Sequence, residues 1–260
     1  MIQGKFEQRI PSTQNAVDIF SGKWATNLAT LLPVQGTGTS NLLDDSRVTD
    51  AAAALGRQCR FQGMSVLELG PLEGAHSYQL ESLGAASVLA IESNTEAFLK
   101  CLVVKEALKL RTNFLCGDVV AYLRETRQHF DLTFCSGILY HMADPVELIR
   151  LICTHSQSCF VWTHYQSEAA IAATTRTPRQ SSDGGFETTL YDATYGDMGY
   201  GQFWGGNRPT AAWMAQAEIV RAFAHFGLTQ HRIVADYPTH PNGASFSVAF
   251  ASDAQGLAPA

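Results

Sequence analysis

From residue 65 onward, short apolar runs of β-forming residues alternate with segments of helical periodicity, and this alternation limits the possible fold more than any other feature. The runs predict strands over 65–69, 87–91, 112–116, 131–135 and 158–162. After the second run, a stripe with a 3.6-residue period predicts a helix over 95–110, formed by Ala97, Cys101, Val104 and Leu108. Strands that alternate with helices form a parallel sheet covered on both faces, so the expected fold class is a doubly wound α/β sheet.

The end of the chain predicts one more helix and a hairpin that complete the same sheet. The helical period resumes over 211–226, with Gly227 placed as a cap and with Trp213, Ala217, Val220 and Ala224 on one face. Strands over 231–235 and 245–251 are joined through Asn242 and Gly243, which favours an antiparallel hairpin at one sheet edge. The whole sheet is therefore expected to be seven-stranded and mostly parallel.

This pattern divides the chain into four parts. We predict an N-terminal cap over 1–60, an alternating core over 61–162, an insertion or lid over 163–208, and a completing segment over 209–260. The cap contains one weak helical pattern, over 49–59. The insertion is far longer than an ordinary connection and carries four aromatic residues among glycines: Tyr195, Tyr200, Phe203 and Trp204. We expect the cap and the insertion to close over a substrate, with some of these aromatics buried or facing it.

Composition excludes several classes of protein. The 18 Lys and Arg residues are outnumbered by 24 Asp and Glu, giving a formal charge of −6, which disfavours a dedicated nucleic-acid binder. The six cysteines form no CxxC pair and lie largely in apolar runs, as expected of reduced, structural thiols. No apolar run is long enough to cross a bilayer, and the N-terminal residues have no apolar signal core, so we expect a cytoplasmic protein without a membrane partner.

The turn after the first predicted strand points to a ligand site. Glu68 and Gly70 end that strand, and Gly74 opens the next helical segment. In a doubly wound sheet this turn lies at the carboxyl edge, where ligands bind and where glycine lets a backbone approach them closely. The GxGxxG pattern of a nicotinamide dehydrogenase is absent, and the acids Glu68 and Glu73 would repel a pyrophosphate. The pattern therefore favours a ligand with a cationic end.

Two further acids follow the next two predicted strands. Glu92 stands 22 positions after Gly70, a spacing at which an acid binds ribose hydroxyls. Asp118 follows Cys116 and Gly117 and could accept a hydrogen bond from an adenine amino group. Together with the glycine turn, these acids predict a nucleoside pocket.

These residues resemble a known family. Glu68-Leu69-Gly70-x-x-x-Gly74, Glu92 and Asp118 are similar to the cofactor signature of class I S-adenosylmethionine (SAM)-dependent methyltransferases, over about residues 60–165, with Leu72 in place of the usual middle glycine. The resemblance implies that the alternating core is a Rossmann-like domain binding SAM. It places Glu68 near the ligand ammonium, Gly70 and Gly74 beneath the amino-acid end, Glu92 on the ribose and Asp118 toward adenine.

A second segment, from Ser136 through Gly137, Tyr140 and His141 to Pro145, is similar to the G-x-LYH-x-x-x-P stretch of a bacterial subgroup. That subgroup includes the tRNA wobble-uridine carboxymethyltransferases, and the resemblance implies that Ser136 and Tyr140 line the cofactor. The full expected cofactor set is Glu68, Gly70, Pro71, Gly74, Glu92, Ser93, Asn94, Gly117, Asp118, Val119, Ser136, Gly137 and Tyr140.

The function expected from this resemblance is methyl transfer from SAM to a small polar acceptor, with O-methylation of a sugar or other metabolite favoured. A hydroxyl acceptor must lose a proton, and histidine titrates near neutral pH. His141 is the first candidate base and His164 the second, because both follow predicted strand ends, and Asp144 could orient one of them. No metal ligand set is predicted.

Other functions remain open at this stage. A tRNA-modifying carboxymethyltransferase would need a cation for the additional carboxylate and a basic face for RNA, whereas this acidic chain has only 5 Lys. A non-catalytic nucleotide-binding module would keep the fold without the chemistry. A closed cavity formed by Tyr140, His141 and the insertion beside the methyl position would distinguish an enzyme from such a module.

Overall fold

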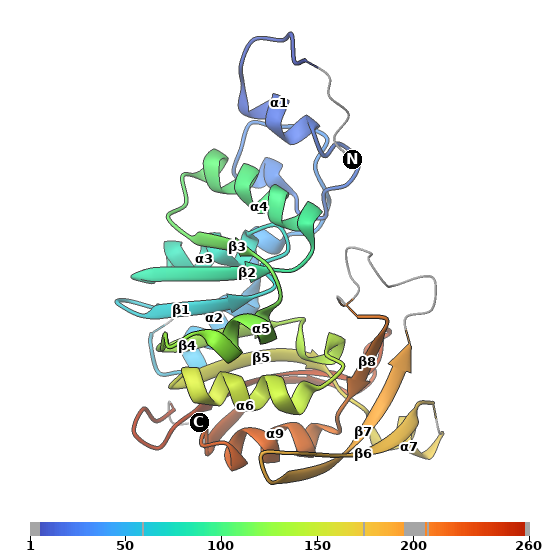
Figure 1. Ribbon diagram of the computed structural model, residues 1–260. Helices are drawn as coiled ribbons and strands as arrows, with labels where there is room; N and C mark the ends of the chain where they lie inside the picture. Colours follow the sequence, from blue (N-terminus) through green and yellow to red (C-terminus); the bar gives the residue numbers. More distant parts are fainter. Residues whose placement is uncertain (1–5, 59, 174, 195–205, 207, 258–260) are drawn as a thin grey trace.

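The computed structural model describes residues 6–58, 60–173, 175–194, 206 and 208–257, and Figure 1 shows their arrangement. The predicted aromatics Tyr195, Tyr200, Phe203 and Trp204 lie outside the described residues. A large sheet occupies the middle of the molecule, with helices on both of its faces and a small second sheet beside it.

The large sheet has seven strands in the order β3-β2-β1-β4-β5-β10-β9. Their bounds are β1 (Ser65–Leu69), β2 (Ser87–Glu92), β3 (Asn113–Cys116), β4 (Leu132–Ser136), β5 (Ser158–His164), β9 (Gln230–Tyr237) and β10 (Ser245–Ala251). The pairings among β1 to β5 are parallel, and β10 is antiparallel to both β5 and β9. The predicted doubly wound sheet with an antiparallel terminal hairpin is confirmed.

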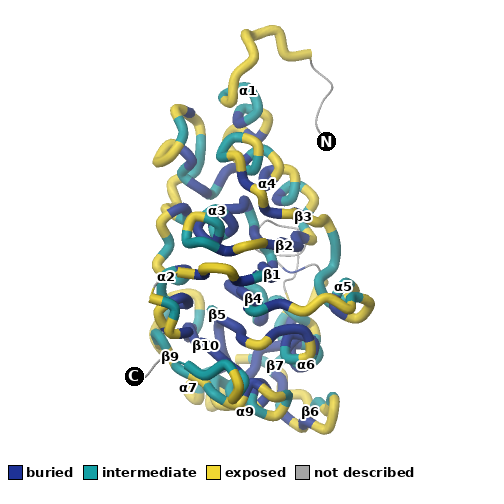
Figure 2. Tube along the Cα trace, turned by 90° about the vertical axis from the view of Figure 1, so that its left-hand side faces the viewer, coloured by how far each residue is buried: buried dark blue, intermediate teal, exposed yellow. Residues whose placement is uncertain are grey.

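Helices cover both faces because successive strand residues point to opposite sides. On one face, Leu67, Cys135 and Val161 pack with α5 (Val119–Glu125), α6 (Pro145–His155) and α9 (Gln216–His225). On the other, Val66 and Phe134 pack with α2 (Ser46–Ala54) and α3 (Ala75–Ser82). Figure 2 shows the buried residues gathered along the strands between these layers. The core therefore holds the strand ends in fixed positions.

The helix α4 (Thr95–Leu108) confirms the predicted stripe. Ala97, Cys101 and Val104 are buried, and Leu108 packs partly buried against the same cluster. Asn94 caps its first turn by accepting hydrogen bonds from the Glu96 and Ala97 amides. The helix thus begins directly after the end of β2.

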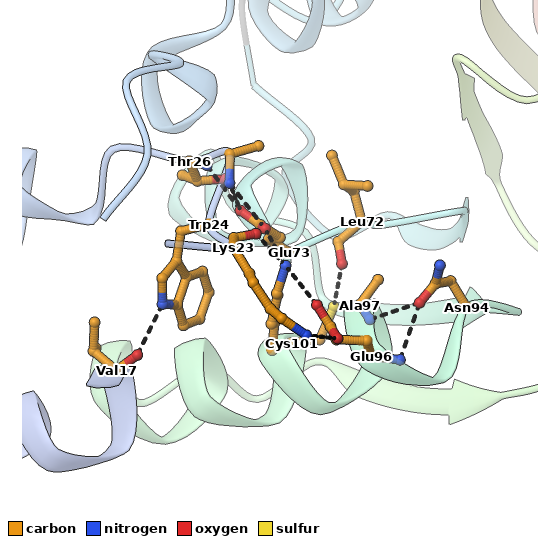
Figure 3. A network of polar contacts seen from close by, with 12 residues as sticks. Val17, Lys23, Trp24, Thr26, Leu72, Glu73, Asn94, Glu96, Ala97 and Cys101 are labelled. Atoms are coloured by element: carbon orange, nitrogen blue, oxygen red, sulfur yellow. Dashed lines mark hydrogen bonds and ion pairs between the residues drawn. The ribbon is translucent and has the colours of Figure 1, made fainter. Parts of the chain in front are cut away.

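The segment before α2 packs in the same cluster as α4 and contains α1 (Thr13–Asp18), η1 (Leu28–Thr30) and η2 (Leu42–Asp44). Glu73 joins this segment to the sheet: its carboxylate accepts hydrogen bonds from the amides of Ala25 and Thr26 and pairs with Lys100 Nζ at 3.1 Å (Figure 3). The expectation that Glu73 contributes negative charge to the ligand site is therefore wrong, because its charge is satisfied on the far side of the turn.

A three-stranded antiparallel sheet follows β5, in the order β6-β7-β8. It consists of β6 (Thr177–Asp183), β7 (Phe186–Thr194) and β8 (Thr210–Trp213), after a short helix α7 (Glu168–Ala172). The Ala212 amide donates to the Met142 carbonyl at 2.7 Å, which attaches this sheet to the turn after β4. Within the predicted insertion, the described residues thus form a helix and two strands over 168–172, 177–183 and 186–194.

Two helix predictions were wrong in position. The helix predicted over 211–226 begins only at Gln216, because Thr210–Trp213 pairs with β7 as a strand. Its buried side is formed by Ile219, Ala222 and Phe223 and not by the predicted stripe. The weak helix predicted over 49–59 lies at Ser46–Ala54, capped by the Asp45 carboxylate.

Candidate active site

A cavity of about 230 Å³ opens at the carboxyl ends of β1, β2 and β4. It lies where the strand order reverses between β1 and β4, the position at which doubly wound sheets bind ligands. Its lining residues are Leu42, Arg47, Gly70, Pro71, Leu72, Ala75, His76, Ile91, Glu92, Ser93, Asn94, Gly117, Val119, Ser136, Gly137, Ile138, Tyr140, His141, Met142 and Gly206. The N-terminal segment, the sheet edge and Gly206 all contribute to it.

The turn after β1 needs left-handed backbone at three positions. Gly70 has φ of 63°, and a Cβ there would collide with the Cδ1 atom of Ile138. Gly74 has φ of 78° and lies against Phe114, below the cavity and not in its lining. Leu72, which stands where the family has glycine, also has a positive φ of 60°. The turn therefore keeps a glycine-like shape at Leu72, at a cost of about 1–2 kcal/mol for a residue with a Cβ.

Glu92 ends β2 with both carboxylate oxygens directed at backbone amides. Oε2 accepts from the Leu72 amide at 2.9 Å, and Oε1 accepts from the Asn94 amide at 2.8 Å. Burial raises the pKa of this carboxyl group, while the backbone donors lower it. Each oxygen can accept a second hydrogen bond from a molecule in the cavity.

Glu68 lies inside β1, away from the cavity. Only 1% of its surface is exposed, and it accepts a hydrogen bond from the Ser77 hydroxyl of α3. Its second oxygen has no hydrogen-bond partner among the described residues. Burial raises its pKa to about 8, with the charge of Glu92 adding to the rise. The structure thus places Glu68 behind the turn, and the expected contact with a ligand ammonium stays a prediction.

The end of β3 supplies backbone to the cavity. Gly117 and Val119 line it, and the Gly117 amide donates to the Glu92 carbonyl at 2.9 Å. The Asp118 carboxylate caps α5 by accepting from the Ala121 amide at 3.0 Å, and Arg208 Nη2 lies 4.0 Å from its other oxygen. Asp118 is therefore beside the cavity without lining it.

An arginine from the N-terminal segment crosses the cavity toward β4. Arg47 Nη1 donates to Ser136 Oγ at 2.9 Å, and its guanidinium lies 4.9 Å from the Trp162 ring centroid. Asp45 pairs with Arg47 and with His76, whose Nε2 lies 3.2 Å from the Asp45 carboxylate. Although burial of Asp45 opposes ionisation, these two partners hold its pKa well below the ordinary range. The network fastens the N-terminal segment over the cavity.

The two predicted bases both pack on Tyr140. Its ring centroid lies 4.1 Å from that of His141 and 4.7 Å from that of His164. Burial lowers the pKa of His141 to about 4 and raises the pKa of Tyr140 to about 12. At neutral pH, His141 is therefore an uncharged imidazole able to accept a proton, and Tyr140 is a phenol able to donate a hydrogen bond.

His164 is set back from the cavity. Its Nδ1 donates to the Gly243 carbonyl at 2.8 Å, which leaves Nε2 as the acceptor nitrogen, and its ring stacks on Trp213 at 5.4 Å. Asp144, expected to orient one of the histidines, instead caps α6 by accepting from the Glu147 amide. The structure thus brings only His141 of the two histidines to the cavity surface.

Most of the expected cofactor residues meet at this cavity. Those in its lining are Gly70, Pro71, Glu92, Ser93, Asn94, Gly117, Val119, Ser136, Gly137 and Tyr140. Glu68, Gly74 and Asp118 lie next to it, behind or beside the lining. Sequence reasoning missed Arg47, because it precedes the alternating pattern and no local motif marks it. It also missed His76, which follows the glycine turn at the start of α3 but has no feature in the sequence that marks it as a cavity residue.

Within the described ranges, no cluster of three or more His, Cys, Asp or Glu side chains could hold a metal ion. Over the same part of the chain, no helix is both long and apolar enough to cross a membrane.

Strand order, terminal hairpin and cavity position together define the fold of class I SAM-dependent methyltransferases, as predicted. The N-terminal domain of EvdMO1, solved in the presence of S-adenosylhomocysteine (SAH) and D-fucose, is similar in structure to this chain. The similarity covers 92% of this chain and 95% of that chain, with a TM-score of 0.67 and 17% sequence identity. The longer EvdMO1 structure matches with a TM-score of 0.57 and 19% identity, over 46% of that chain.

Distant sequence similarity to the predicted subgroup is also found. The tRNA U34 carboxymethyltransferases of Campylobacter hominis and Chromohalobacter salexigens are 30% and 31% identical to this chain, each over 90 residues. The matched segment covers 34% and 33% of this chain, and 31% and 27% of those proteins. The match thus spans about a third of the length of these curated relatives. No family model matches the chain.

Proposed function

We propose that this chain is a SAM-dependent methyltransferase that methylates a hydroxyl group of a small polar acceptor, with a sugar as the favoured class. The cavity carries this proposal, because it combines the glycine turn and the Glu92 carboxylate with Tyr140 and His141 in one lining. On this proposal, one part of the lining binds the nucleoside and the other accepts the proton of the acceptor.

The lining fits SAM. Glu92 lines the cavity, and the acceptor capacity that its backbone hydrogen bonds leave suits the adjacent hydroxyls of a ribose. Gly70 and Pro71 would lie beneath the amino-acid end, and Gly117 and Val119 would lie beside the adenine. Bound SAM supplies a methyl group on a positively charged sulfur, which is already an activated electrophile.

The chain's own groups have to align the acceptor and remove its proton. Tyr140 can hold the acceptor oxygen by donating a hydrogen bond, and His141 can take the proton released when that oxygen bonds to the methyl carbon. His164 supports the position of Tyr140 by packing on its ring. We therefore propose His141 as the base and His164 as the second candidate.

The sugar class is supported by the whole-chain likeness to the EvdMO1 domain, which was solved with D-fucose. At 17% identity this likeness establishes the fold, and the acceptor is our inference. The tRNA carboxymethyltransferase match favours a second candidate function. Against that candidate, the cavity cation Arg47 is paired with Asp45, and the chain carries a net charge of −6.

Calorimetry with SAM and SAH tests the cofactor half of the proposal. Glu92→Ala is expected to weaken SAM binding roughly 10- to 100-fold, or about 1–3 kcal/mol, because the ribose loses a charged acceptor. Glu96→Ala, which changes an acid four residues further on in the first turn of α4, is the matched control and should bind SAM as the wild type does. Unchanged affinity in Glu92→Ala would contradict the placement.

A screen for SAH release, with neutral and charged sugars on one arm and unmodified tRNA on the other, separates the two candidate functions. Release of SAH from SAM with a sugar supports O-methylation, whereas release only with tRNA, from a donor that carries a carboxymethyl group on the sulfonium in place of methyl, supports the second function. Binding of SAM without SAH release, either with the sugars or with tRNA, would favour a non-catalytic nucleotide-binding module.

A further inference from the structure

Arg176 lies directly before β6 and is held flat against an aromatic ring. Its guanidinium carbon is 3.6 Å from the Trp213 ring centroid, and Nη1 donates to the side-chain oxygen of Gln166 at 2.7 Å. Gln166 is itself 1% exposed, and its backbone N–H donates to the carbonyl of Met214, the residue after Trp213. The guanidinium therefore has a fixed position and orientation.

This arginine is partly buried without a matching negative charge. Its observed side-chain partner is a neutral amide, and no ion pair joins it to a carboxylate among the residues described. Arg179, three residues further along, pairs with Asp192 instead. Burial lowers the pKa of Arg176, as expected of a cation held away from water without compensation.

Arg176 and Trp213 do not line the cavity themselves, but the ring of Trp213 connects Arg176 to Tyr140, which does. Trp213 lies 6.0 Å from Tyr140, which lines the cavity, and 5.4 Å from His164, ring centroid to ring centroid. The charge of Arg176 is also felt at His164, where it contributes to the lowered pKa. An acceptor seated at Tyr140 would thus lie one aromatic ring away from the Arg176 guanidinium.

We propose that Arg176 on Trp213 is an anion-binding subsite of the acceptor site, and that the acceptor is a hydroxylated small molecule carrying a carboxylate or phosphate group. This inference rests on the proposed methyl transfer, whose acceptor class it narrows. The planar guanidinium suits the two oxygens of either anion. The hydrogen bond to Gln166 occupies Nη1, so the N–H groups of Nε and Nη2 can donate to a ligand.

The subsite is tested by following the side-chain Nε–Hε signals of the arginines and the indole signal of Trp213 by NMR. The SAH-loaded protein is titrated at constant ionic strength with D-glucuronate, D-glucose 6-phosphate and neutral D-glucose. We expect saturable shifts at Arg176 and Trp213 with at least one anionic sugar and none with glucose. The stronger of the two anions identifies carboxylate or phosphate as the recognised group.

Matched variants make the result specific. Arg176→Gln should weaken binding of the anionic probe at least 10-fold, measured at the Trp213 signal, whereas Arg179→Gln should leave it unchanged. Equal shifts at Arg176 and Arg179, or no saturable shift with either anion, would overturn the proposal. The titration is repeated without SAH, so that failure of SAH to bind counts against the methyltransferase proposal and leaves the anion result readable.

Discussion

Two glutamates of neighbouring strands, Glu68 and Glu92, show how position decides what a carboxyl group can do. Glu92 ends its strand, so its oxygens meet backbone amides and the cavity. Glu68 is one residue before the end of its strand, so its side chain is enclosed beneath α3 with one hydroxyl partner. The first is suited to binding a ligand, whereas the second is suited to staying protonated.

Glu68 should make stability depend on pH. Its pKa is about 8 in the folded chain and about 4.5 when exposed, so the folded state holds a proton that the unfolded state releases between these values. The resulting stabilisation is fully present below pH 4.5 and is lost as pH rises through 8, at about 1.4 kcal/mol per unit of pKa shift. Urea unfolding of Glu68→Gln should show a smaller loss of stability between pH 5 and 8.5 than the wild type.

Glu106→Gln, which changes an exposed acid on α4, serves as the control and should follow the wild type over this range. Parallel pH profiles for Glu68→Gln and the wild type would contradict the assignment of a protonated Glu68.

His141→Ala should lower kcat at least 10²-fold with SAM affinity intact, because the acceptor proton loses its recipient. His129→Ala, an exposed histidine, is the control. Since the pKa of His141 is about 4, the acid limb of kcat/KM in the wild type should lie near pH 4 and not near 6.5. Turnover within a few-fold of wild type in His141→Ala would exclude the base role.

At the scale of elements, α4 connects the N-terminal segment to the turn after β1. Lys100 is 1% exposed, pairs with Glu73, and donates to the Lys23 carbonyl. Breaking such a buried pair leaves a charge without compensation, which costs more than the pair itself contributes. The attachment of residues 17–43 to the turn after β1 therefore depends on a buried lysine of α4.

Lys100→Met should destabilise the fold by about 3–5 kcal/mol, because the Glu73 carboxylate is left buried and unpaired. The double variant Lys100→Met with Glu73→Gln should recover part of this loss, and Lys23→Met, at an exposed ion pair, should cost far less. Denaturant unfolding measures all three. Equal effects of Lys100→Met and Lys23→Met would contradict the role of the buried pair.

At the scale of the whole molecule, the cavity is lined by residues from the N-terminal segment, from β2 and β4, and by Gly206. A ligand bound there stabilises all of these parts together. With SAH at 100 times its Kd, binding adds about 2.7 kcal/mol, which should raise Tm by roughly 5–10 °C. A thermal scan should show one transition that moves as a unit.

The shift should be smaller for Glu92→Ala at the same SAH concentration. Separate transitions, of which only one responds to SAH, would show that the N-terminal segment is not coupled to the cavity. The division of the chain into cap, core and lid stays a prediction. The closure of the cap and the insertion over the substrate also stays a prediction, and the thermal scan tests whether these parts unfold together.

The sequence by itself determined the alternating strands and helices of the core and the terminal hairpin, and it predicted where a ligand would bind. These depend on local information: the apolar period along each segment, the glycines of the turn after β1, and the acid that ends β2. The strand β8 was misread because Thr210–Trp213 continues a helical period and becomes a strand only by pairing with β7.

Only the tertiary structure decided which side chains share the cavity. Arg47 meets Ser136, a residue 89 positions away, and Arg176 meets Trp213 across the second sheet. The same packing buried Glu68 and set His164 behind Tyr140, although both follow the pattern of ligand-binding residues. Such contacts depend on how distant segments pack against one another, and side-chain burial and pairing in three dimensions leave no period or motif in the sequence.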